Sequence, residues 1–189
     1  MAGGYFSNAA VFLLKTLFGL YIGAVMLRLL LQWVRADFYN PLSQAIVKVT
    51  NPLLRPLRRI IPALGRLDTA SVVLMLVLQG LSTWLIHTVV GFHPGFGGTL
   101  LIALAELLSN LIYLYLFAII VQAAASWIAP GSYNPILTLF DSITAPLLRP
   151  IRQVLPDLGG IDFSPLVAIV LLQLALQLIV APLTDLGAL

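Results

Sequence analysis

The arginines of this chain occur in two groups, and their spacing is suited to the binding of anions. Arg55, Arg58 and Arg59 stand within five residues of one another, and Arg149 and Arg152 form a second group further along the chain. A guanidinium group can hold phosphate oxygens through two parallel hydrogen bonds. Each group therefore predicts an anion-binding surface.

The other reactive side chains predict neither a catalytic centre nor a metal site. The chain has two histidines and no cysteine. His87 and His93 are six residues apart, which is not the spacing of one helix face, so we expect interfacial or hydrogen-bonded roles for both. The glycine-rich stretch 91–98 follows no strand and is therefore no dinucleotide fingerprint. We expect no enzymatic activity, no metal and no cofactor.

Four polar side chains interrupt long apolar segments, namely Lys15, Arg28, Glu106 and Gln122. A charge within a membrane marks a functional site by default. Arg28 lies close to one end of its segment, so we expect it to snorkel to the membrane surface. Lys15 and Glu106 lie near the opposite ends of theirs, where a mutual ion pair would neutralise both.

The segments that carry these charges are long enough to cross a bilayer. Hydrophobic residues make up 60% of the 189 residues and charged residues 9%, with a mean hydropathy of +1.04, against roughly 25% charged residues in soluble domains. One small core cannot bury so much apolar surface, which excludes a soluble globular protein. A disordered chain is excluded too. We expect an all-α membrane protein with four transmembrane helices, at about 9–34, 69–90, 100–128 and 163–183.

The connections between the spans predict their orientation. Eight of the ten Lys and Arg residues lie in the connections 35–66 and 129–162, whereas the turn between the second and third spans has none. Basic loops stay in the cytoplasm, so we expect both connections there and both termini outside. The chain begins without the basic start and cleavage pattern of a signal peptide, so we expect the first span to stay as an anchor.

The sequence repeats itself at an offset of 94 residues. Over residues 33–79, 18 of 47 positions are identical to their counterparts. We expect two units, 1–95 and 96–189, in the same orientation and related by an axis along the membrane normal. The recurring positions include Trp33, Asn40, Pro41, Pro52, Pro56, Gly65 and Asp68, with their counterparts Trp127, Asn134, Pro135, Pro146, Pro150, Gly159 and Asp162.

Each loop is predicted to hold an amphipathic helix. Asn40–Pro41 and Asn134–Pro135 are typical helix starts, because Asn caps the first turn and Pro fits the first helical position. Further on, apolar residues cover an arc of roughly 120° and the arginines lie opposite. These apolar residues are Leu53, Leu54, Leu57, Ile60 and Ile61 in the first loop and Leu147, Leu148, Ile151, Val154 and Leu155 in the second.

The residues that follow predict how each loop returns to the membrane. We expect Pro62 to stop the first loop helix, Gly65 to supply the turn and Asp68 to cap the returning span. Pairing of Asp68 with Arg58 or Arg28 is the alternative. The counterparts 94 residues later have the same expected roles.

A basic amphipathic helix between two spans is expected at the inner membrane surface, with its guanidinium groups at lipid phosphates. Three interpretations stay open: a topological anchor alone, a surface for lipid or a partner protein, and a site for a phosphorylated substrate. Nucleic acid is not an expected partner of so hydrophobic a chain.

The doubled motif resembles the YggT (YlmG) family of small bacterial and plastid membrane proteins. It reads R-x4-W-x5-YNP…NPLLRPLRRIIPALG-x-LD at 28–68 and W-x5-YNP…APLLRPIRQVLPDLGGIDFSP at 127–165. The family has no agreed biochemical activity, so the resemblance implies none. It does imply a link to osmotic tolerance, cell division or the assembly of membrane complexes. The second unit departs from the first by having Gln122, Gln153 and Gly160 where the first has Arg28, Arg59 and Arg66.

The patterns predict a non-enzymatic membrane protein, and the resemblance implies a scaffold, assembly factor or osmotic-stress tolerance factor in the plasma (inner) membrane of a bacterium. It would act through its basic inner-face helices on anionic lipid headgroups or on a membrane-protein partner, and a homo-oligomer stays open. The alternative is an oligomeric channel or transporter for ion or solute balance.

Side-chain sizes predict how the first and third spans meet. Small residues let helices approach closely in lipid. We expect Tyr113 to pack against Gly19 and Phe117 against Gly23 within one chain. The alternative is a homodimer seam along the two glycines.

Overall fold

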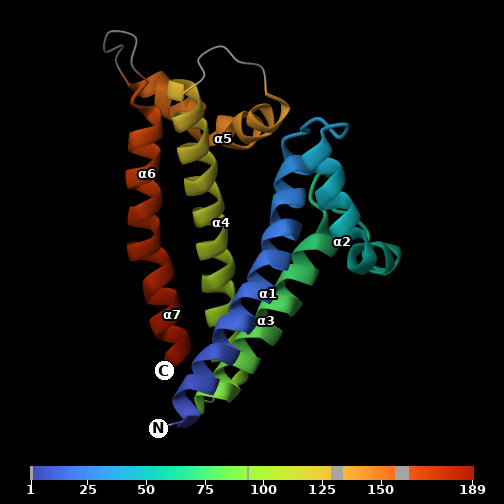
Figure 1. Cartoon of the computed structure of the whole chain (residues 1–189), viewed down its shortest axis with the longest axis vertical. Coiled ribbons are helices and arrows are strands. Elements are labelled where there is room, and N and C mark those ends of the chain that lie inside the picture. Colours follow the sequence, from blue (N-terminus) through green and yellow to red (C-terminus); the bar gives the residue numbers. More distant parts are fainter. Residues whose placement is uncertain (1, 93, 129–133, 156–161) are drawn as a thin grey trace.

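The computed structural model describes residues 2–92, 94–128, 134–155 and 162–189, and its regular elements in these ranges are helices. Four of them, α1, α3, α4 and the continuous rod of α6 and α7, are long and apolar enough to cross a membrane. This confirms the predicted all-α membrane fold with four spans. The elements are α1 (Ala2–Trp33), α2 (Pro41–Ile60), α3 (Thr69–Val90), α4 (Phe96–Ile128), α5 (Pro135–Val154), α6 (Ser164–Ala175), the π-helical turn η1 (Leu176–Val180) and α7 (Ala181–Ala188), shown in Figure 1.

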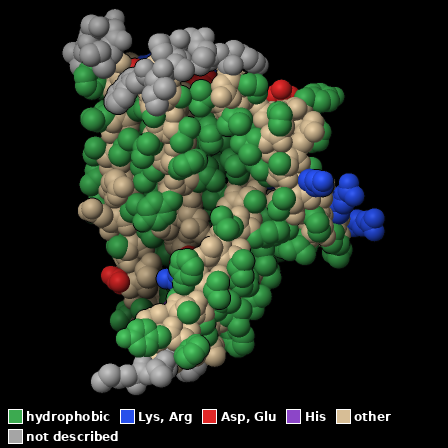
Figure 2. Space-filling model, viewed as in Figure 1, with side chains coloured by type: hydrophobic (Ala, Val, Ile, Leu, Met, Phe, Trp, Pro, Cys, Tyr) green, Lys and Arg blue, Asp and Glu red, His purple; other side chains and the backbone are tan. Residues whose placement is uncertain are grey.

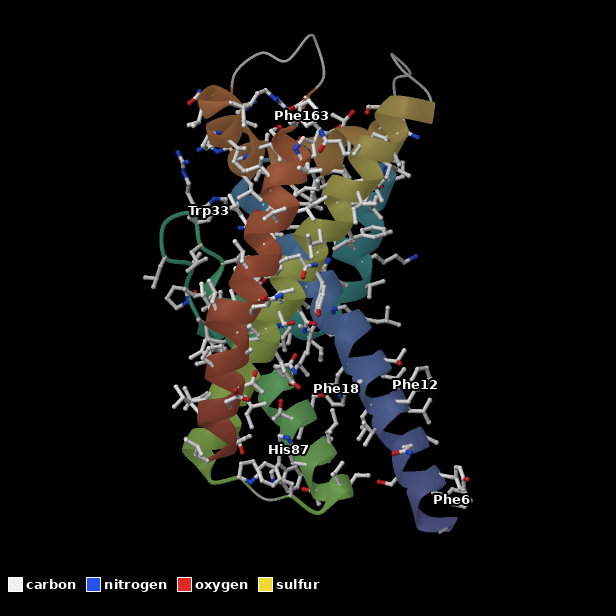
Figure 3. All side chains as sticks on the ribbon, turned by 90° about the vertical axis from the view of Figure 1, so that its left-hand side faces the viewer. Phe6, Phe12, Phe18, Trp33, His87 and Phe163 are labelled. Atoms are coloured by element: carbon white, nitrogen blue, oxygen red, sulfur yellow. The ribbon has the colours of Figure 1, made fainter. Side chains whose placement is uncertain are left out.

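The spans form two pairs, α1 with α3 and α4 with α6–α7 (Figure 1). The pairs approach each other at the end that carries both termini and diverge towards the end that carries α2 and α5. We call these the turn end and the loop end. Large apolar side chains of α1, such as Phe6 and Phe12, point away from the bundle (Figure 3), as expected for side chains that contact lipid.

One stripe of each loop helix packs against the spans. α2 buries Ser43, Ile46, Thr50 and Leu54, which are three or four residues apart and so lie on one face. Leu54 joins the core between α1 and α3, and Ile46 joins a second core that contains residues of both α1 and α5. The loop helices of the two units therefore share a core. The residues that α5 buries are Leu139, Ile143, Thr144 and Leu148.

The predicted apolar arc of α2 is divided between the protein and its surroundings, because Leu57 is half-buried and packs beside Leu54 on the core. Leu54 is the only buried member of the arc, whereas Leu53 is exposed and Ile60 is 82% exposed. The helix is thus docked on the protein along one stripe, and its neighbouring apolar side chains are left for lipid. Leu54 and Leu57 thus pack on the protein, whereas Leu53 and Ile60 keep the outward position that the sequence predicted for the arc.

The predicted packing of Tyr113 on Gly19 and of Phe117 on Gly23 is wrong. A Cβ added to either glycine would meet no heavy atom within 4 Å, and both aromatic side chains are more than half exposed. The reason is the rotation of α4, because successive residues of a helix lie about 100° apart and the face that meets α1 carries leucines. The α4 residues packed against this core are Leu107, Leu111 and Leu114.

The close approach of two helices lies in the second unit, between Gly98 of α4 and Gly187 of α7. A Cβ at Gly187 would stand 2.7 Å from Cγ1 of Ile102 and 2.9 Å from the carbonyl oxygen of Gly98. Real Cβ atoms do not come so close, so glycine is required here. Small residues do permit close packing in this fold, but between a different pair of helices from the one predicted.

Candidate anion-binding site

Both loop helices begin as predicted. The side-chain oxygen of Asn40 accepts a hydrogen bond from the Leu42 N–H at 3.0 Å, and that of Asn134 accepts one from the Ile136 N–H at 2.9 Å. A proline occupies the start of each helix. Asn40 also donates from Nδ2 to the carbonyl oxygen of Pro135 at 2.6 Å, which links the first turns of α2 and α5.

The end of each loop helix is tied to the start of the next span by an ion pair. Arg58 Nη2 lies 2.5 Å from Asp68 Oδ2, and Arg152 Nη2 lies 2.6 Å from Asp162 Oδ2. In both pairs Nε donates to the same carboxylate oxygen, at 3.2 Å and 3.1 Å. The two pairs are 94 residues apart, so both units contain the same loop closure.

The predicted capping bond is absent at Asp68, and Asp162 makes a bond of this kind from one residue before Phe163, the N-cap position of α6. Asp162 accepts a hydrogen bond from the Ser164 N–H at 2.9 Å. Asp68 stands at the N-cap position of α3, but its side chain makes no capping bond to the backbone. It turns to Arg58 instead and accepts a second bond from the Ser71 hydroxyl, because a guanidinium group in reach is a stronger donor than a backbone N–H.

These contacts change the acidity of both carboxyl groups. Burial alone raises the pKa of Asp68, but hydrogen bonds from Arg58 and Ser71 lower it further than burial raises it. The net pKa of Asp68 lies below its usual value. The pKa of Asp162 is lowered in the same way, against a raising effect of burial, by hydrogen bonds from Ser164 and Arg152.

Arg28 does not snorkel to the surface as predicted. It is 8% exposed, and its Nη1 donates to Thr50 Oγ1 at 2.7 Å and to Asn51 Oδ1 at 2.9 Å. The Val47 carbonyl oxygen lies 3.5 Å from the same nitrogen. The guanidinium group turns inward because α2 folds back over this part of α1 and offers it oxygen acceptors.

Gln122 holds the equivalent position in the second unit. Its Oε1 accepts a hydrogen bond from the Thr144 hydroxyl at 2.7 Å, and its Nε2 donates to Asp141 Oδ1 at 2.6 Å. Thr144 is the counterpart of Thr50 at the same offset of 94 residues. The structure therefore repeats this contact between span and loop helix, with a neutral amide in place of the guanidinium group.

A cavity of about 330 Å³ opens beside Arg28 and Arg58 in the first unit. Arg58 also reaches Gln32 Oε1 from Nη2, at 3.4 Å. Two guanidinium groups thus line one space between α1 and α2. The other lining residues are Leu31, Gln32, Ala36, Phe38, Ser43, Ile46 and Val47.

Charge is distributed unequally between the two loops. Residues 35–68 carry six basic and two acidic side chains, whereas residues 129–162 carry two and three. The predicted arginines of α2 (Arg55, Arg58, Arg59) and of α5 (Arg149, Arg152) are all exposed. Figure 2 shows the basic side chains of α2 gathered on one side of the molecule. The first unit is therefore the stronger candidate for binding anions.

A second polar pocket, of about 180 Å³, lies within the spans nearer the turn end, and Lys15 and Glu106 both line it. Their expected ion pair is not formed, since none of the ion pairs in the described part of the chain joins them. Glu106 accepts hydrogen bonds from Gln79 Nε2 at 2.5 Å and from the Thr83 hydroxyl at 2.7 Å instead. Both donors lie on α3, which packs directly against α4.

The remaining predicted residues add no chemistry. His87 packs edge-on against Phe92, with ring centroids 5.3 Å apart, and its buried Nδ1 has no partner in the described part of the chain. Trp33 is half exposed at the loop end (Figure 3). No metal-binding group of His, Asp or Glu occurs among the described residues. His93, Gly159 and the side chain of Trp127 lie outside them.

Sequence reasoning could have found some of these partners. Thr50 and Thr144 recur at the 94-residue offset, and each lies 22 residues beyond the polar side chain that it meets. Gln79 recurs as well, and it is a buried polar residue in an apolar span. The contact between Gly98 and Gly187 has no such paired signal, because Gly98 has a counterpart in Gly4 but the position 94 residues before Gly187 is His93.

Comparisons with known proteins place these features in a family. The model of the CCB3/YggT family matches residues 7–89 and 101–183, two segments that are themselves offset by 94 residues. A relative from Pseudomonas aeruginosa is 46% identical over 92% of this chain and 89% of its own length. YggT of Escherichia coli K12 is 41% identical over 87% of this chain and 86% of its own. No solved structure matches.

Proposed function

The chain belongs to the CCB3/YggT family, and from this premise we propose that it is a non-enzymatic membrane scaffold that binds anionic lipid headgroups through the basic face of α2. Its place is the plasma (inner) membrane of a bacterium, with the loop end in the cytoplasm and both termini outside. Lipid bound there holds the loop end at the membrane surface, where a membrane-protein partner can assemble on it.

The docking of α2 is the observation that carries this proposal. Thr50 and Leu54 fasten the helix to the spans, while Arg55 and Arg59 stay exposed. A basic surface held rigidly against the side of a transmembrane bundle is suited to anionic headgroups (Figure 2). Arg58 is committed to Asp68, so it adds less charge to the outer face.

Lipid selectivity of the full-length protein tests the proposal. Reconstituted in phosphatidylcholine with a small fraction of fluorescent phosphatidylglycerol, the protein is expected to enrich the anionic lipid at its surface, as measured by energy transfer from its tryptophans. Arg55→Gln with Arg59→Gln should reduce this enrichment, by about fivefold per charge at low salt. Enrichment that is unaffected by the two substitutions and by salt would leave α2 with the role of a topological anchor.

A channel or transporter is the second candidate, and the polar pocket lined by Lys15 and Glu106 is the observation that favours it. Polar side chains in the spans of an apolar chain mark solute pathways in many membrane proteins. Flux assays on the purified protein in liposomes separate the two candidates. Solute or ion flux that Glu106→Gln abolishes would support transport, and lipid enrichment without flux would support the scaffold.

A further inference from the structure

We propose that the cavity between α1 and α2 binds the phosphate group of one anionic phospholipid, with Arg28 and Arg58 as its ligands. The proposal deepens the function proposed above and rests on it. It differs in assigning one lipid molecule to a defined site, whereas the exposed arginines attract headgroups in general.

The first reason is the uncompensated charge of Arg28. The hydrogen bonds shown for this side chain all leave from Nη1, and no carboxylate of the described residues lies within ion-pair distance of it. A guanidinium group has five N–H donors, so Nε and Nη2 are left for a ligand. A buried cation without a counter-ion is costly, and a bound anion would offset that cost.

The second reason is the composition of the cavity wall. Arg28 and Arg58 stand with Gln32 and Ser43 as polar groups, and the remaining lining residues are apolar. Two guanidinium groups in one cavity suit the oxygens of a phosphate. The apolar part of the wall suits the carbon chain of a lipid, and gives inorganic phosphate nothing to bind.

The position of Arg58 is set before any ligand arrives. Its Nε and Nη2 both donate to Asp68, and that carboxylate is itself held by Ser71. Such an arrangement limits the entropy that the side chain loses when it binds a ligand. Arg28, by contrast, has no ion-pair partner among the described residues.

The second unit lacks the means to bind an anion at the equivalent place. Gln122 replaces Arg28 there, and its amide donates to the carboxylate of Asp141. Asp141 is the counterpart of Val47, which lines the cavity of the first unit. A carboxylate at this point repels phosphate, so we expect one lipid site for each chain.

The second unit also supplies the substitution that tests the site. Arg28→Gln recreates the side chain that Gln122 already has in this fold, so its amide can still bond to Thr50 while the charge is lost. Lys48→Gln is the matched control, because it removes one exposed charge from α2 and Lys48 does not line the cavity.

The experiment is native mass spectrometry of the full-length protein released from detergent micelles that contain phosphatidylglycerol. The wild-type chain is expected to retain one lipid molecule. Arg28→Gln should reduce retention at least tenfold, and Lys48→Gln by less than threefold. Equal losses in the two variants, or no loss in Arg28→Gln, would overturn the proposal. The two proposals can fail separately. If Arg28→Gln leaves retention unchanged while surface enrichment still depends on Arg55 and Arg59, the site in the cavity is excluded and the proposed function stands.

Two further measurements keep the result interpretable. Ala36→Leu narrows the cavity without touching either arginine, and we expect it to lower retention too, even if Arg28→Gln proves unstable; full retention in Ala36→Leu would count against the cavity. Competition distinguishes the source of the phosphate. Glycerol phosphate or inorganic phosphate at the same concentration should fail to displace the lipid, and displacement would overturn its assignment as a lipid site.

Discussion

Arg58 and Asp68 join the end of α2 to the start of α3 through a carboxylate oxygen that accepts two N–H groups of one guanidinium, and Arg152 and Asp162 repeat the pair in the second unit. The first pair is the more deeply placed, since the Asp68 side chain is 4% exposed and that of Asp162 is 43% exposed. The same contact is therefore expected to have unequal strength in the two units.

Removing the carboxylate charge should destabilise the first unit more than the second. We expect Asp68→Asn to lower the free energy of unfolding by about 1–3 kcal/mol, because the Arg58 guanidinium then loses the charged carboxylate that it pairs with at a buried position. Asp162→Asn should cost less than about 1 kcal/mol, since water screens an exposed pair. Unfolding in mixed micelles of increasing sodium dodecyl sulfate fraction measures both. Equal losses would show that burial does not set the strength of the pair.

The lowered pKa of Asp68 predicts how stability depends on pH. A carboxyl group whose pKa is lower in the folded state adds stability that is fully present above its unfolded pKa, about 3.9. That contribution is lost as the pH falls through the folded pKa. The wild-type protein should therefore lose stability below about pH 4, and Asp68→Asn should lose less over the same range. Parallel pH profiles of the two proteins would contradict this.

The contacts of Thr50 and Thr144 predict a second difference between the units. Thr50 accepts a hydrogen bond from a charged guanidinium, whereas Thr144 donates to a neutral amide. Bonds to charged groups are the stronger. Thr50→Val should cost about 1.5–3 kcal/mol of unfolding free energy and Thr144→Val about 0.5–1.5 kcal/mol, measured by the same denaturation. A larger loss for Thr144→Val would contradict the assignment.

Glycine substitutions should separate the close helix contact from the open one. Gly187→Ala pushes a methyl group against Ile102 and the backbone of Gly98, so we expect a loss of about 1–3 kcal/mol. Gly19→Ala and Gly23→Ala meet open space and gain helix propensity, worth up to about 1 kcal/mol each in a helix interior. Thermal unfolding in detergent measures all three. A change of oligomeric state in the Gly19 or Gly23 variant would instead support the homodimer seam.

Orientation is a prediction that reporter fusions check. The basic residues of the loop connections predict that both connections lie in the cytoplasm. Fusions after Gly65 and after Gly159 should report the cytoplasm, and a fusion after Gly95 should report the outside. A cytoplasmic signal at Gly95 would show that the bundle has the opposite orientation, with the basic face of α2 on the outer surface of the membrane.

The sequence by itself determined the features that depend on one segment at a time. Apolar runs of sufficient length specify spans because backbone groups in lipid must bond within their own helix. Asn40 and Asn134 mark helix starts because a cap acts over two or three residues. Once the ion pair of Arg58 with Asp68 is known, the offset of 94 residues predicts the second pair, Arg152 with Asp162.

Only the tertiary structure decided which side chains meet between helices. Arg28 turned to Thr50 instead of the surface, Glu106 to Gln79 instead of Lys15, and α4 presents leucines instead of Tyr113 to α1. The spans are apolar on every side, so hydrophobic periodicity does not say which face packs inward. In lipid the rotation of a helix is set by close packing and by a few interhelical hydrogen bonds, and these exist only once the helices are side by side.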